Sequence, residues 1–89
     1  MTVRPQPREV KHIVARVFLE LGASMPSLFH LKETLFVSDG ECLARSYRAA
    51  GLKAVWLLDE GIIRFHDAQG NVLRTVNLFD ELVPQVMAA

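Results

Sequence analysis

Between residues 7 and 21 apolar residues recur at helical spacing, and polar residues fill the positions between them. The recurring apolar set is Val10, Ile13, Val14, Val17, Phe18 and Leu21. This spacing places the set on one face of an α-helix. Pro7 suits the first turn, where its missing N–H needs no partner, and Gly22 suits the left-handed residue that follows a helix. The pattern therefore predicts an amphipathic helix over residues 7–21, preceded by a loose arm over residues 1–6.

The segment that follows loses the helical period. Ser24, Pro26 and Ser27 interrupt helical hydrogen bonding and favour a turn over residues 23–27. The apolar residues of 28–37 then fit neither the helical nor the strand period well, although residues 33–37 are of β-forming types. We expect a strand over residues 33–37.

From Ser38 onward, turn-forming residues recur about every ten residues, which is typical of an antiparallel meander. These turns are predicted at Asp39-Gly40, at Gly51, at residues 59–61 and at residues 67–71. The runs between them, 55–58, 62–66 and 72–76, are rich in β-branched and aromatic residues. Three consecutive strands are therefore expected.

Residues 41–50 have two competing interpretations. Ser38 with Glu41 forms a capping box and Gly51 could end a helix, so a helix over residues 40–50 is locally acceptable. Alternatively, residues 43–48 alternate in character and Asp39-Gly40 is a strong hairpin turn. The regular turn spacing favours the strand.

After Asn77, apolar residues again recur at helical spacing until Pro84, which predicts a short C-terminal helix. The expected fold class is α+β, with the N-terminal amphipathic helix packed on an antiparallel β-meander of four to five short strands. Residues 7–89 form one small domain, because 89 residues rarely hold two cores. The predicted core is Ile13, Val14, Val17, Phe18, Leu35, Val55, Leu57, Ile63, Phe65 and Leu73. Trp56 is expected on the sheet face opposite Val55 and Leu57.

Composition narrows the classes of function. Ten basic and ten acidic residues give a formal net charge of zero, so no overall field attracts the chain to polyanions. Its single cysteine excludes an intramolecular disulfide and a multi-thiolate zinc site. Without a signal-peptide pattern or a long apolar run, we expect a soluble, cytoplasmic protein with no membrane partner.

The sequence contains few of the residue patterns that catalysis or cofactor binding requires. The glycines form no phosphate-binding loop, and His12, His30 and His66 lack the spacing of paired metal ligands. Cys42 with His66 as a base is the best candidate for a nucleophile, but a small packed thiol is the stronger interpretation. Asp59 and Glu60 suit a solvated hairpin turn. We therefore expect no enzyme activity, no metal and no cofactor.

Basic and aromatic residues gather in the predicted sheet. The full set is Arg45, Tyr47, Arg48, Lys53, Trp56, Arg64, His66 and Arg74. A sheet face carrying them could stack bases and bind phosphates, as single-strand binding surfaces do. The candidate binding surface comprises Trp56, Arg64, His66 and Arg74, with Tyr47 and Arg48. Its convergence depends on strand register, and the alternative is a half-exposed sheet whose wet face is lined by arginines.

Apolar residues exceed what so small a core needs. The surplus is Phe29, Leu31, Leu52, Trp56, Leu78, Phe79, Val86 and Met87. Surplus apolar surface usually marks an interface, and a homodimer through the second sheet face or an edge strand would bury it. A compact monomer with Trp56 partly exposed remains the alternative. The sequence thus favours a non-catalytic protein-interaction or self-association module over single-stranded nucleic-acid binding.

Overall fold

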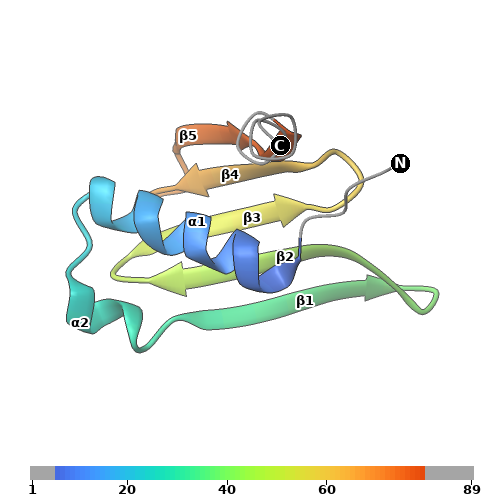
Figure 1. Cartoon of the computed structure of the whole chain (residues 1–89), viewed down its shortest axis with the longest axis horizontal. Helices are drawn as coiled ribbons and strands as arrows, with labels where there is room; N and C mark the ends of the chain where they lie inside the picture. The colour runs from blue at the N-terminus through green and yellow to red at the C-terminus, as the bar shows by residue number, and fades with distance from the viewer. Residues whose placement is uncertain (1–5, 80–89) are drawn as a thin grey trace, which may run out of the picture.

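The computed structural model describes residues 6–79 and shows one helix packed on a five-stranded antiparallel sheet. The elements are α1 Pro7–Glu20, α2 Met25–Leu28, β1 Lys32–Ser38, β2 Glu41–Ala49, β3 Leu52–Leu57, β4 Ile62–His66 and β5 Val72–Asn77. Each strand pairs with the next along the chain, so the strand order is β1-β2-β3-β4-β5 (Figure 1). The predicted α+β class is confirmed. The predicted C-terminal helix falls largely on residues 80–89, which lie outside the described residues.

Helix α1 forms where the apolar period predicts it. Pro7 stands in its first turn, and Gly22 follows its end with a φ of 107°. Val10, Val14 and Phe18 have no exposed surface, because the apolar stripe faces the sheet. In Figure 1 α1 crosses in front of β2 and β3, and β1 lies clear of it at the lower edge. We call the sheet face against α1 the helix-covered face and the opposite one the open face.

Two tight hairpins confirm the strand interpretation of residues 41–50. Asp39 and Gly40 have φ values of 53° and 80°, and Ala50 and Gly51 have φ values of 53° and 76°. Consecutive left-handed residues are the geometry of type I′ turns, whose twist matches that of the strands they join. Residues 41–49 are therefore strand β2, and the alternative helix does not form. Strand β3 starts at Leu52, three residues before the predicted run at 55–58.

The turn predicted over residues 23–27 is wrong in part, because the short helix α2 begins there. The Ser24 side chain accepts a hydrogen bond from the Ser27 N–H, which caps the helix. Pro26 lies in the first turn, where helical geometry does not require its missing N–H. The serine and proline pattern that indicated an interruption is therefore also a helix start.

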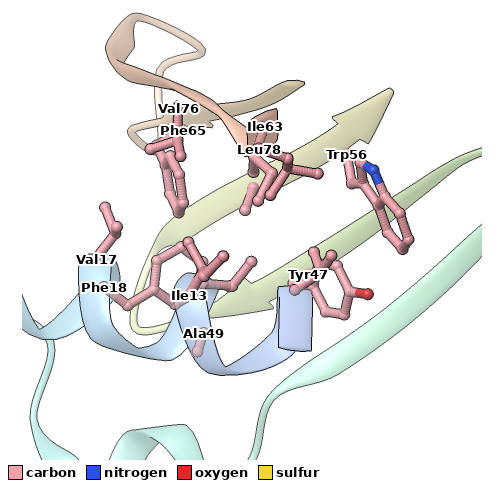
Figure 2. Packing of buried hydrophobic residues seen from close by; sticks show 13 residues of the cluster. Ile13, Val17, Phe18, Tyr47, Ala49, Trp56, Ile63, Phe65, Val76 and Leu78 are labelled. Atoms are coloured by element: carbon pink, nitrogen blue, oxygen red, sulfur yellow. The ribbon is translucent and has the colours of Figure 1, made fainter. Parts of the chain in front are cut away.

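The hydrophobic core lies between α1 and the helix-covered face (Figure 2). The Phe18 and Phe65 rings meet edge to face with their centroids 5.8 Å apart. Six of the ten predicted core residues are buried: Ile13, Val14, Val17, Phe18, Ile63 and Phe65. The core also contains residues that were not predicted, among them Tyr47 and Trp56.

The predicted orientation of β3 is wrong. Trp56 lies in the core with 4% of its surface exposed, whereas Val55 and Leu57 are half-buried on the open face. The run 55–58 is apolar on both sides of the strand, so its hydrophobicity alone could not identify the inner face. Ala54 pairs with Phe65 on the inner face, and strand alternation places Trp56 beside it.

Two further core predictions are wrong because both residues belong to edge strands. Leu35 in β1 is 49% exposed and Leu73 in β5 is 45% exposed. Strand β1 lies beyond the cover of α1, and Leu73 falls at an irregularity where β4 pairing passes from Arg74 to Val72. Neither residue therefore has a second layer to pack against.

Candidate functional site

The sheet divides the six residues of the predicted binding surface between its two faces. Tyr47, Trp56 and Arg74 lie on the helix-covered face, where Tyr47 and Trp56 are buried. Arg48, Arg64 and His66 lie on the open face, since each neighbours an inward-facing residue on its strand. The aromatic rings and the open-face cations therefore do not form one surface.

Two arginines of the original basic and aromatic set are held by carboxylates on the helix-covered face. The Arg45 guanidinium lies 3.2 Å from the Glu33 carboxylate and 5.9 Å from the centroid of the Trp56 ring. Arg74 on β5 donates to the Glu20 carboxylate at the end of α1. These contacts pin an edge strand to its neighbour and β5 to the helix. Both arginines are thus structural, and neither adds charge to the open face.

Tyr47 is completely buried beside this cluster. Its hydroxyl, the Trp56 indole N–H and the Arg45 Nε–H have no hydrogen-bond partner within residues 6–79. In Figure 2 the ring of Tyr47 stands between α1 and the strands, with its oxygen directed away from the apolar side chains. Burial, together with the neighbouring Glu33 carboxylate, raises the pKa of Tyr47. The side chain is therefore a neutral phenol at physiological pH.

A row of basic side chains crosses the open face. Lys32 pairs with Arg48, Arg48 with Lys53, and Lys53 with His66. Neighbouring strands are about 4.8 Å apart, so these four residues, which we call the basic row, form a continuous line across β1–β4. None of the four has an ion-pair partner within residues 6–79. The neutral net charge of the chain thus conceals one local concentration of positive charge.

An open hollow of 420 Å³ lies at the end of the sheet beside the basic row. It is lined by Arg48, Lys53 and Asp67, with residues 49–52 of the β2–β3 turn and Ala68. The Asp67 carboxylate accepts hydrogen bonds from the backbone N–H groups of Gln69 and Asn71, both at 2.9 Å. Hydrogen bonds from the Asn71 side chain and backbone lower the pKa of Asp67. The Asp67 carboxylate therefore stabilises the β4–β5 turn through these hydrogen bonds. Arg48 and Lys53 remain available to bind an anion.

A second row on the open face is apolar. Phe36 pairs with Ala44, Ala44 with Leu57, and Leu57 with Ile62. We call these four residues the apolar row. Phe36 is 47% exposed at the β1 end, while Leu57 and Ile62 are half-buried. Unlike the basic row, the apolar row ends at an open sheet edge with a large hydrophobic side chain.

Strand β1 is the most apolar exposed element of the described residues. All seven of its residues are exposed, and Leu35, Phe36 and Val37 are 49%, 47% and 60% exposed in succession. On its far side no strand of residues 6–79 is paired with it, so within that part of the chain a set of backbone N–H and C=O groups is unpaired there. The sequence predicted an edge strand as one possible interface but did not identify β1, and it placed Leu35 in the core. The signal that could have identified β1 is its run of three consecutive apolar residues, which fits neither period.

The other edge of the sheet differs from β1. Strand β5 carries a register irregularity opposite β4, and its Arg74 is bound to Glu20. Bulges and inward-pointing charges are the features that protect edge strands from pairing with another chain. Strand β1 also has such features, since its register with β2 shifts between Phe36 and Val37 and its Glu33 is bound to Arg45 on the helix-covered side. It nevertheless exposes three apolar residues in succession. The two edges therefore differ in the length of their exposed apolar run, which is three residues in β1 and two, Val72 and Leu73, in β5.

The predicted nucleophile does not meet its base. Cys42 lies at the start of β2 and its thiol contacts the Ala44 carbonyl oxygen at 3.5 Å. His66 lies on β4 at the other end of the sheet, with β3 between the two strands. Within residues 6–79 no group of three or more histidine, cysteine or acidic side chains is placed to hold a metal ion. Neither helix in that part of the chain has the length and apolar character needed to cross a bilayer.

Comparison with known proteins identifies no relative. No family model matches the chain, and neither the curated proteins nor the solved structures contain a significant match. Function must therefore be inferred from the two rows and the exposed edge.

Proposed function

We propose that this domain is a non-catalytic protein-interaction module that associates through the β1 edge. The observation that carries the proposal is the run of three exposed apolar residues, Leu35 to Val37, on an edge strand of the sheet. An added strand would pair the free backbone groups and cover these side chains together. The proposal assigns two roles to one sheet: the helix-covered face stabilises the domain and β1 binds.

The β1 edge satisfies both requirements of strand addition. Backbone hydrogen bonds supply a regular template, and side chains on alternating sides of the strand supply specificity. Phe36 lies on the open face, whereas Leu35 and Val37 lie on the helix-covered side. A partner strand would therefore bury apolar surface on both sides of the sheet.

Lysine substitutions at matched sites on the two edges test this proposal. Val37→Lys in β1 and Val72→Lys in β5 replace valines that are 60% and 57% exposed. We expect Val37→Lys to weaken association strongly, because it sets a hydrated charge beside the apolar residues of an added strand, and Val72→Lys to leave association unchanged. Light scattering after size exclusion, over a range of concentrations, measures the mass of each protein.

The wild-type mass is expected to rise with concentration from 10.0 kDa toward twice that value. Circular dichroism melting curves verify that both variants are folded. A wild-type protein that stays monomeric at about 500 μM, where even a weak and small interface should be populated, would exclude self-association through β1. An equal loss of association in Val37→Lys and Val72→Lys would show that the β1 edge has no special role.

Binding of single-stranded nucleic acid is a second candidate, favoured by the basic row. Lys32, Arg48 and Lys53 carry charges without ion-pair partners in the described residues, and Arg64 lies on the same face. The row follows a line across four strands, which suits a phosphate backbone. Base stacking is less well supported, since Tyr47 and Trp56 are buried on the other face and Phe36 is the one phenylalanine that strands β1–β5 place on the open face.

The salt dependence of oligonucleotide binding tests this candidate. Substituting both Arg48 and Lys53 with glutamine should reduce the slope of log K against log salt by about 1.4, or 0.7 for each lost phosphate contact. The matched control substitutes Arg8 and Lys11, which are exposed on α1, with glutamine. Fluorescence anisotropy of a labelled single strand at two salt concentrations measures both slopes. Absence of wild-type binding at low salt, or equal effects of the two double variants, would rule the candidate out.

A further inference from the structure

We infer that the partner of β1 is a second copy of this chain, paired antiparallel about a two-fold axis that passes through Phe36. The inference rests on the proposed use of the β1 edge and specifies the occupant and its register. Two five-stranded sheets would join into one continuous sheet with both α1 helices on the same side. The three observations behind it are the polarity of β1, the position of the apolar row and the charges at the ends of β1.

The polarity of β1 is symmetric about Phe36. When Phe36 faces its own copy, Leu35 faces the partner's Val37 and Thr34 faces the partner's Ser38. Directly opposed residues of an antiparallel pair point to the same face, so each apolar residue meets an apolar one and each hydroxyl a hydroxyl. An axis through Leu35 would instead set Val37 against Glu33 and Phe36 against Thr34. Only the Phe36 axis matches every pair from 34 to 38.

The same axis joins the two apolar rows end to end. Phe36 is the outermost member of the row that continues through Ala44 and Leu57 to Ile62. With Phe36 opposite its own copy, the row would run without a break across the open faces of both subunits. The exposed Phe36 rings would cover each other at the centre of this band, which accounts for a large hydrophobic side chain at a sheet edge.

Charge complementarity favours the antiparallel orientation. The β1–β2 hairpin tip is acidic, with Asp39 and Glu41, whereas the opposite end of this strand pair carries Lys32 and Arg48. Antiparallel pairing brings each acidic tip beside the basic end of the other copy, and parallel pairing would bring like charges together. Glu33 does not oppose this arrangement, because Arg45 of its own chain neutralises it.

Disulfide trapping reads out the register directly. In a Cys42→Ser background, single cysteines are introduced at residues 34 to 38, all in β1, and the proteins are mildly oxidised alone or in pairs. Directly opposed residues have Cα atoms about 4.5–5.5 Å apart, within disulfide range. We expect Phe36→Cys to cross-link with itself. Leu35→Cys should cross-link with Val37→Cys, and Thr34→Cys with Ser38→Cys, but none of these four alone, because its own copy is offset along the strand.

The test does not depend on the Phe36→Cys variant alone, because the mixed cysteine pairs keep the Phe36 side chain. Thr34→Cys and Ser38→Cys leave Leu35, Phe36 and Val37 intact, so their cross-linking supports the register even if Phe36→Cys is monomeric. Val72→Cys on β5 is the control that should not cross-link. Efficient cross-linking of Leu35→Cys alone would overturn the Phe36 axis.

The outcomes separate this inference from the proposed function. A dimer in light scattering that no β1 cysteine traps would overturn the inference by placing the interface elsewhere. A wild-type monomer would remove the second copy as the occupant. Loss of association in Val37→Lys together with cross-linking between residues 35 and 37 supports both.

Discussion

Replacing Phe65 with alanine is expected to lower the free energy of unfolding by about 3–5 kcal/mol, so the variant should unfold at a much lower urea concentration than the wild type. Phe65 has no exposed surface and its ring meets Phe18 edge to face, so truncation removes contacts on both sides of the core. Phe→Ala substitutions in cores cost about 3–5 kcal/mol. Domains of this size have a total stability of only about 5–10 kcal/mol, so the loss is a large share of the whole.

The chain contains its own probe and its own control for this experiment. Trp56 is the single tryptophan and is buried, so its fluorescence reports unfolding in urea. Phe29→Ala deletes the same atoms from a side chain that is 84% exposed and should change the free energy of unfolding by less than about 0.5 kcal/mol. If Phe65→Ala were no more destabilising than Phe29→Ala, the helix-covered face would not be the core.

Alkaline pH is expected to destabilise the domain through Tyr47. Unfolded tyrosine has a pKa of about 10, and burial with the nearby Glu33 carboxylate raises the pKa of Tyr47 in the folded state. Below about pH 10 the phenol is neutral in both states, and its contribution to stability is constant. Above that pH the unfolded state loses the proton first, so stability falls with rising pH by at most about 1.4 kcal/mol per unit.

Tyr47 is the only tyrosine, so tyrosinate absorbance follows this one group. The absorbance should appear together with the loss of buried Trp56 fluorescence, well above the pH at which a free tyrosine ionises. Tyr47→Phe removes the ionisation and should show a shallower alkaline loss of stability in urea titrations. Because the hydroxyl has no partner in residues 6–79, the variant should be at least as stable as wild type at neutral pH. Tyrosinate forming near pH 10 in the folded protein would contradict the buried position.

These expectations distinguish the two faces of one sheet. Substitutions at Tyr47 or Phe65 on the helix-covered face should change stability, whereas those at Phe36 or Val37 on β1 should change association. Changes at Arg48 and Lys53 in the basic row should alter only anion binding. A domain whose exposed apolar edge lies outside its core can bind through its sheet without disturbing the core that holds the sheet together.

Local chemistry determined most of the secondary structure. The apolar period of α1 and the left-handed residues at Asp39-Gly40 and Gly51 act within a few positions, so they could be recognised along the chain. The choice of strand over helix for residues 41–49 followed from the regular spacing of these turns. Helix α2 was missed because Ser24 and Pro26 suit a turn and a helix start equally well.

Tertiary structure alone decided which side of the sheet each residue faces and which strands form its edges. A shift of one position along a strand moves every side chain to the opposite face, and the run 55–58 is apolar at both parities. Register with β2 and β4 placed Trp56 in the core, on the face opposite Arg64 and His66. The predicted basic and aromatic binding surface therefore does not form. Neighbouring strands come from distant parts of the chain, so only their assembly left the apolar residues of β1 uncovered and brought four basic residues into one row.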